Sequence, residues 1–246
     1  MRIDQRKNSD LRPLSIEIGV NRYAEGSALI RLGHTHVLCT ASLEMNVPKW
    51  LQGQNKGWVT AEYGMLPRST HERMNREKAA SSGRTQEISR LVARSLRSAV
   101  DMYKLGERQI NIDCDVLQAD GGTRTAAITG GFVALVQALA YLKTKEPQLQ
   151  APLKHFVSAT SVGMIKGDAL LDLCYQEDST AETDANFVMS SAGDFIEIQG
   201  TAEEKPFTQQ QLQLMIELAH SGCQKLFEEQ KRVLTPLNYT SLLGSP

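Results

Sequence analysis

The most constraining feature of the sequence is the segment 126–142, which has apolar or small residues on nearly every side of a helix. A helix without a polar face has to be covered by protein all round, so this segment predicts a buried core helix. The residues before it, 110–116, alternate between apolar and polar side chains, a pattern typical of a strand. The centre of the chain therefore predicts a fold that mixes strands and helices.

The turn between this strand and this helix, 120–125, has a composition that suits phosphate. Glycines let backbone N–H groups approach a ligand, and a helix N-terminus offers free N–H donors and a positive dipole end. Arg124 adds a forked cation that matches phosphate oxygens. The turn makes Gly122, Thr123 and Arg124 candidate phosphate ligands. Because it is not a Walker A motif, an ordinary strand-to-helix turn with a solvated arginine remains the alternative.

A similar order of elements occurs twice along the chain. Strand patterns in the first part lead to the helix at 126–142, and strand patterns after residue 156 lead to an amphipathic helix that begins at Thr208. The sequence thus predicts two pseudo-repeated halves, at about 10–143 and 153–234, each a meander of strands followed by a helix. The polar first dozen residues are expected to form a loose arm, and residues 235–246 a frayed tail.

The charge is locally polarised although the net charge is only −1. Residues 68–97 contain eight Lys or Arg and three Asp or Glu. Within this stretch Arg68, Arg73 and Arg76 follow Pro67 in a segment with little apolar periodicity, which predicts a loop. These arginines could grip a nucleic-acid backbone, or the loop could simply be solvated.

Acidic residues offer two candidate pairs for a metal ion. Asp178 and Asp184 flank a polar loop, and Mg²⁺ often takes one or two protein carboxylates while it keeps other positions for water and phosphate. Asp113 and Asp115 share one face of a strand and are a rival pair. An acidic surface loop without a metal is the third possibility for 176–186.

Several classes of protein are disfavoured by what the sequence lacks. The four cysteines are far apart with no CxxC, which argues against a zinc site and for reduced thiols. There is no GxSxG and no HExxH, so positioning and electrostatics around phosphate are the expected chemistry. An apolar run long enough for a membrane span and an apolar signal region are also missing, so a cytoplasmic location without membrane attachment is expected.

Five stretches together resemble the ribonuclease PH family, whose members trim tRNA with phosphate. They are residues 57–71, 82–88, 113–126, 177–186 and 198–203. The resemblance runs from about residue 10 to residue 234 in a single register. It implies one α/β (α+β) domain over residues 1–246, and a ring-shaped homohexamer built as a trimer of dimers.

The resemblance also implies roles for individual residues. Inorganic phosphate, the co-substrate, would be bound by Arg84, Gly122, Thr123 and Arg124. Mg²⁺ or another divalent ion would be bound by Asp178 and Asp184, and tRNA by Arg68, Arg73 and Arg76.

The implied activity is a phosphate-dependent, reversible 3′-to-5′ exoribonuclease in tRNA and rRNA processing. It would trim tRNA precursors and release nucleoside diphosphates. A catalytically silent RNA-binding ring subunit is the alternative, and an enzyme for a small phosphorylated substrate is a third. The basic stretch 68–97 favours RNA over the small substrate.

Overall fold

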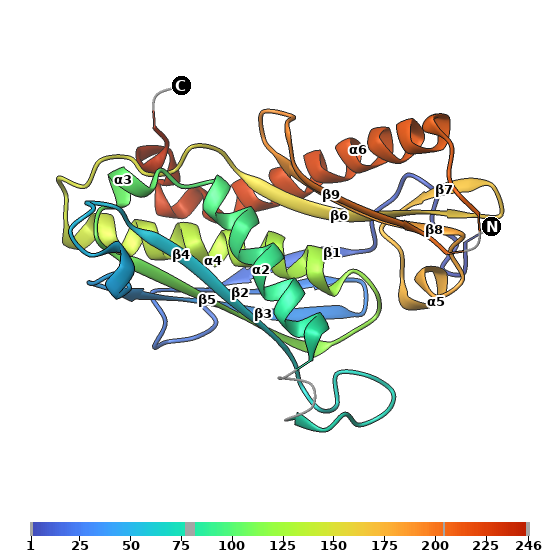
Figure 1. The fold of residues 1–246 in the computed structure, drawn as a ribbon, viewed down its shortest axis with the longest axis horizontal. Coiled ribbons are helices and arrows are strands. Elements are labelled where there is room, and N and C mark those ends of the chain that lie inside the picture. Colours follow the sequence, from blue (N-terminus) through green and yellow to red (C-terminus); the bar gives the residue numbers. More distant parts are fainter. Residues whose placement is uncertain (1, 77–81, 204, 245–246) are drawn as a thin grey trace.

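The first half of the chain forms a five-stranded sheet (Figure 1). The structure is a computed structural model and describes residues 2–76, 82–203 and 205–244. The strands are β1 (Leu14–Ile18), β2 (Gly26–Leu32), β3 (Thr35–Glu44), β4 (Trp58–Met65) and β5 (Gln109–Gln118), and their order is β1-β2-β3-β5-β4. Neighbouring strands are antiparallel except for β4 and β5, which are parallel. A parallel pair needs a crossover, and α2 (Gly83–Ser98) and α3 (Met102–Leu105) lie in it.

The second half forms a four-stranded antiparallel sheet with the order β7-β6-β8-β9. Its strands are β6 (Val157–Ile165), β7 (Asp168–Leu171), β8 (Thr183–Ser190) and β9 (Phe195–Ala202). The short helix α5 (Tyr175–Asp178) joins β7 to β8, and the long helix α6 (Gln209–Leu234) follows β9. A capping box at Thr208 starts α6 where the sequence predicted it.

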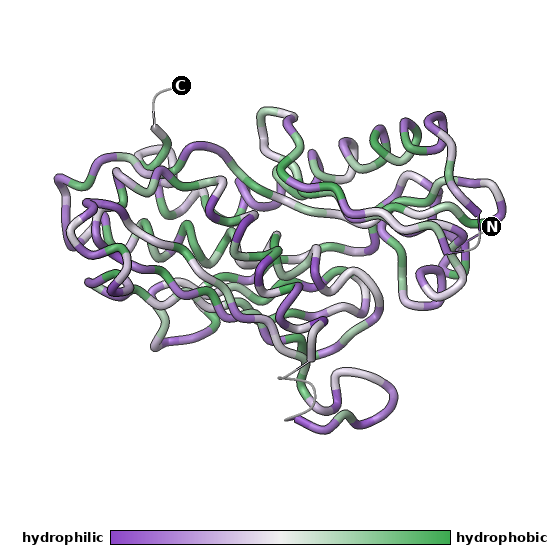
Figure 2. The backbone as a smooth tube through the Cα atoms, viewed as in Figure 1, coloured by the Kyte–Doolittle hydropathy of each residue, from purple (hydrophilic) through white to green (hydrophobic). Residues whose placement is uncertain are grey.

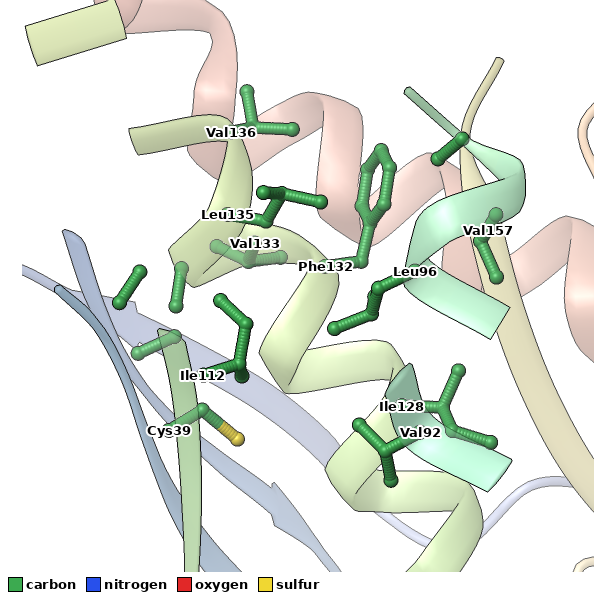
Figure 3. Close-up of a cluster of buried hydrophobic side chains, with 14 of the residues drawn as sticks. Cys39, Val92, Leu96, Ile112, Ile128, Phe132, Val133, Leu135, Val136 and Val157 are labelled. Carbon is green, nitrogen blue, oxygen red and sulfur yellow. The ribbon is translucent and has the colours of Figure 1, made fainter. Parts of the chain in front are cut away.

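The helix α4 (Thr123–Lys145) lies between the two sheets. It packs on β2 and β3 on one side and on β6 on the other, and α6 covers the far side of β6 (Figure 1). In Figure 3, Phe132 and Ile128 of α4 lie among Ile112 of the first sheet, Leu96 of α2 and Val157 of the second sheet. The mixed α/β prediction and the buried helix at 126–142 are both confirmed.

The apolar character of α4 follows from this position. Figure 2 shows hydrophobic residues along the helix, in contrast to the mainly polar and neutral loop after β4. By length and composition α4 could cross a membrane, but 89% of its most apolar window is buried inside the fold. Core helices pass the same test of length and composition, so the burial of α4 between the two sheets explains its hydropathy.

Both ends of the chain differ from expectation. The predicted loose arm is wrong, because Arg2 and Arg12 are 6% and 3% exposed and are bonded to the second half. The predicted frayed tail is also wrong over its described part. The short 3₁₀ helices η2 (Thr235–Leu237) and η3 (Tyr239–Leu242) bring Leu242 into the core, and its carbonyl accepts a hydrogen bond from the backbone of Leu153 at 2.9 Å. Residues 245–246 lie outside the described part.

Candidate active site

One pocket of about 830 Å³ collects candidate residues from both halves of the chain. Its lining includes all six residues assigned to phosphate and metal from the sequence: Arg84, Gly122, Thr123, Arg124, Asp178 and Asp184. The first four belong to the N-terminal ends of α2 and α4, and the two carboxylates come from α5 and β8. Figure 1 shows these helix ends on the same side of the molecule as α5.

Arg84 lies at the start of α2 for a local reason. The side chain of Ser82 accepts a hydrogen bond from the backbone N–H of Thr85 at 3.1 Å, so the helix begins at Gly83. Arg84 is the second residue of α2. Its exposed guanidinium therefore adds to the positive end of the α2 dipole at the pocket.

The glycine turn before α4 has backbone angles that residues with a side chain rarely adopt. Gly121 and Gly122 have φ values of +74° and +63°. A Cβ on Gly121 would lie 2.5 Å from the carbonyl oxygen of Leu173, and that backbone cannot move aside cheaply. The turn can thus approach the second half closely only because residue 121 lacks a side chain.

A buried ion pair holds the turn from behind, and sequence reasoning missed it. The Arg12 guanidinium donates to both carboxylate oxygens of Asp172, with Nε–Oδ2 at 3.0 Å and Nη2–Oδ1 at 2.7 Å. The same guanidinium also donates to the carbonyl of Asp120. Asp172 is 1% exposed. This pair ties the N-terminal segment, the turn and the second half together at the pocket.

Two hydroxyl groups complete the support of the turn. The Thr35 hydroxyl donates to the carbonyl of Gly121 at 2.6 Å and accepts from the N–H of Asp120 at 3.0 Å. The Tyr63 hydroxyl lies 2.8 Å from the Thr123 hydroxyl, and burial raises the pKa of Tyr63. Neither residue carried a sequence signal beyond its place in a strand, because these contacts join segments that are distant in the chain.

Arg124 is held by contacts to neighbouring elements. Its Nη1 donates to the side-chain oxygen of Gln199 on β9 at 2.8 Å and lies 3.5 Å from Oε1 of Glu87 on α2. The Arg124 side chain is 19% exposed, so it still reaches the pocket. With Arg84 and two helix N-termini nearby, the pocket is suited to a phosphate group.

The carboxylates of Asp178 and Asp184 lie close enough to influence each other. Burial raises the pKa of Asp178, and the charge of Asp184 raises it further, while Arg84 and Arg124 act in the opposite direction. A divalent cation would relieve this repulsion. Among the described residues no group of three or more His, Cys, Asp or Glu could hold a metal. A pair of carboxylates beside a phosphate pocket fits Mg²⁺, which needs only one or two protein carboxylates.

The rival acidic pair lies in a different pocket. Asp113 and Asp115 line a cavity of about 600 Å³ together with Glu62, and burial raises the pKa of both aspartates. The glycine turn does not contribute to the lining of that cavity. The structure thus brings Asp178 and Asp184 to the candidate phosphate ligands and keeps Asp113 and Asp115 apart from them.

The three arginines predicted to bind tRNA are exposed on the segment after β4. Arg68 donates to the carbonyl of His71 at 2.7 Å, and residues 70–72 and Met74 of the same segment line the pocket. Arg68, Arg73 and Arg76 are not among the lining residues. They lie on the same segment as the lining residues 70–72 and Met74, and residues 77–81 of the same basic stretch lie outside the described part.

Comparison with known proteins identifies the class. Residues 10–140 match domain 1 and residues 155–222 match domain 2 of the 3′ exoribonuclease family. The chain therefore belongs to the 3′ exoribonuclease family. Ribonuclease PH from Bdellovibrio bacteriovorus is 56% identical in sequence, over 95% of this chain and 96% of the relative's chain. Ribonuclease PH from Methylobacterium radiotolerans is also 56% identical, over 95% of this chain and 100% of the relative's chain. By this membership and identity the chain is a phosphate-dependent 3′-to-5′ exoribonuclease.

A solved structure supports the fold. The structure of the Archaeoglobus fulgidus exosome with RNA bound to the active site superposes with a TM-score of 0.77 at 20% identity, over 93% of this chain and 92% of that chain. At this identity the likeness concerns the fold alone. The ribonuclease PH-like architecture suggested by the sequence is thereby confirmed.

Proposed function

We propose that the chain trims the 3′ ends of tRNA precursors by phosphorolysis, in the pocket between its two halves. The observation that carries the proposal is the convergence of two arginines, two helix N-termini and two carboxylates in one pocket. RNA phosphorolysis brings together an anionic nucleophile and an anionic backbone, and this set of groups is suited to neutralising both.

In the proposed reaction, inorganic phosphate binds to Arg84, Arg124 and the N-terminus of α4 at Gly122 and Thr123. One phosphate oxygen forms a bond to the phosphorus of the last phosphodiester. The bond from that phosphorus to the 3′ oxygen of the preceding ribose breaks. A nucleoside diphosphate leaves, and the proton of the attacking hydrogen phosphate passes to the 3′ oxygen, so the shortened RNA ends in a free 3′ hydroxyl. One phosphate linkage replaces another, so the reaction is reversible.

The protein's main task in this reaction is electrostatic. Two like charges ~4 Å apart repel by about 4 kcal/mol at an effective dielectric near 20. Arg84 and Arg124 oppose that repulsion from one side of the pocket. Asp178 and Asp184 would hold Mg²⁺ or another divalent ion, which when bound supplies positive charge to the reacting phosphates.

Arg68, Arg73 and Arg76 are proposed to contact the tRNA body. Their exposure on a segment that also lines the pocket supports this role, because phosphate contacts require accessible cations near the path of the RNA. Such a grip outside the pocket would favour structured RNA with a short single-stranded 3′ tail.

The assembly proposed for the chain is a homohexameric ring, a trimer of dimers, in the cytoplasm. Family membership and the exosome-like fold support a ring, and the four free thiols suit a reducing compartment. The mass of the particle in solution, compared with 27.2 kDa for one chain, tests the number of subunits.

The deciding experiment is incubation of a 3′-extended tRNA with the protein and Mg²⁺, with and without inorganic phosphate. Nucleoside diphosphates that form only with phosphate are the expected result. Nucleoside monophosphates formed equally well without phosphate would show hydrolysis and contradict the mechanism. No product under either condition would favour a catalytically silent RNA-binding ring subunit.

Replacing Asp178 by asparagine is expected to raise the Mg²⁺ concentration for half-maximal trimming by about tenfold or more. Loss of a residue that only hydrogen-bonds to a metal ligand already lowers metal affinity by about 10–100-fold, and Asp178 is proposed to be a ligand itself. Calorimetric titration with Mg²⁺ measures the same loss without any turnover. Asp113→Asn is the matched control and should leave both values unchanged. Equal shifts in the two variants would remove Asp178 from the metal site.

Replacing Arg73 by alanine is expected to weaken trimming of a 3′-extended tRNA more than cleavage of a short unstructured RNA. Each lost phosphate contact should reduce the slope of log affinity against log salt by about 0.9 for a duplex region. The exposed Arg22, in the β1–β2 connection, provides the control variant Arg22→Ala. Equal losses on the two RNAs would contradict a role in binding the tRNA body.

A further inference from the structure

Gln199 on β9 connects the phosphate pocket to two acidic side chains. Its side-chain oxygen accepts the hydrogen bond from Nη1 of Arg124 at 2.8 Å. Its Nε2 donates to Oε1 of Glu87 at 3.1 Å and to Oε1 of Glu197 at 3.0 Å. The residue belongs to the 198–203 stretch, which the reaction described above leaves without a role.

This network fixes the orientation of the Gln199 amide. Ionised carboxylates only accept hydrogen bonds, so the NH₂ group has to face Glu87 and Glu197. The oxygen is then left to face Arg124. Glu197 is itself held, because Arg94 of α2 donates to both of its carboxylate oxygens, at 2.8 and 3.0 Å from Nη2. The amide is thus oriented by elements from both halves.

The neutrality of Gln199 matters for the charge in the pocket. An amide oxygen can hold a guanidinium by a short hydrogen bond without cancelling its charge, whereas a carboxylate there would form a salt bridge that competes with phosphate. The existing acidic neighbour is a weak competitor. Glu87 lies 3.5 Å from Arg124 and is 46% exposed, so its attraction is screened by solvent.

We propose that Gln199 is a positioning residue, which holds the guanidinium of Arg124 at the phosphate pocket and leaves its positive charge available for the attacking phosphate. The proposal rests on the proposed function of the same pocket. It predicts that residue 199 acts on phosphate binding through Arg124 and has no direct contact with the RNA.

Two variants test the proposal: Gln199→Glu, which keeps the shape and adds a charge, and Gln199→Leu, which removes the hydrogen bonds. Both should raise the KM for phosphate: Gln199→Glu because its carboxylate competes with phosphate for Arg124, and Gln199→Leu by about tenfold or more, the value of one hydrogen bond to a charged group. The KM for RNA and the kcat at saturating phosphate should stay within about twofold, because a general loss of folded enzyme would lower kcat instead. Gln213→Glu, which adds the same charge on the exposed face of α6, is the control.

A double-mutant cycle separates this role from a structural one. In an Arg124→Ala background, Gln199→Leu should produce no further rise in the KM for phosphate, because its target is gone. An equal rise in both backgrounds, or an unchanged KM in both single variants, would overturn the proposal. If the proposed function itself is wrong, the unmodified protein will form no nucleoside diphosphate. That outcome can be distinguished from both KM results.

Discussion

Replacing Arg124 by alanine is expected to raise the phosphate concentration for half-maximal trimming by about 100-fold, because charge-assisted hydrogen bonds contribute about 1.5–3 kcal/mol each. The loss should fall on phosphate and spare the RNA, since Arg124 lies at the N-terminus of α4 beside Gly122 and Thr123. Initial rates measured against phosphate at saturating tRNA determine the effect.

The matched control for this experiment is Arg90→Ala. Arg90 is an exposed arginine of α2 that lines the other pocket, with Asp113 and Asp115. Its loss removes one positive charge from the same region of the surface without changing the glycine turn. An unchanged phosphate requirement in Arg124→Ala, or an equal increase in Arg90→Ala, would exclude Arg124 as a specific phosphate ligand.

Replacing Arg12 by methionine is expected to destabilise the fold by about 3 kcal/mol, because the buried carboxylate of Asp172 loses its bidentate partner and keeps only the backbone N–H of residue 12 and the more distant Arg6, at 3.5 Å. For a chain of this size that corresponds to a fall of the thermal midpoint by roughly 10 °C. The variant should also bind phosphate less well, since the Arg12 guanidinium donates to the carbonyl of Asp120 in the turn. Thermal unfolding followed by circular dichroism measures the first effect.

An exposed ion pair provides the comparison. Arg31 and Glu17 lie 3.3 Å apart on neighbouring strands, with side chains 37% and 61% exposed. Arg31→Met should therefore change stability by less than about 1 kcal/mol. The double variant Arg12→Met with Asp172→Leu should recover part of the loss, because it removes the stranded charge as well. If Arg12→Met and Arg31→Met lower the midpoint equally, the buried pair does not hold the turn.

The central part of the fold could be predicted because its signals are local. The apolar residues of 126–142 and the alternation in 110–116 indicate directly which residues are buried, and Thr208 marks the start of its helix. The partners of Asp178 could not be derived in this way. The sequence pattern offered Asp178 and Asp184 as one of two candidate pairs, but their position beside the two arginines depends on packing between the halves, and only the family resemblance linked them to Arg84 and Arg124.

The errors at the two chain ends have a common cause. Polar residues near a terminus usually remain solvated, and nothing within the first dozen residues shows that Arg12 meets Asp172, which is 160 positions away. The same holds for Leu242, which enters the core through contacts with residue 153. Long-range pairing of this kind leaves no periodic pattern in one sequence.

The attachment of the N-terminal segment to the second half also determines when the enzyme can become active during its synthesis. Arg2 is hydrogen-bonded to Glu177, and Arg12 to Asp172. The N-terminal residues are therefore synthesised long before the residues with which they pair. Until residues 172–177 emerge, the glycine turn lacks its support from Arg12 and the pocket lacks Asp178 and Asp184. A shorter nascent chain therefore lacks groups that the proposed reaction requires.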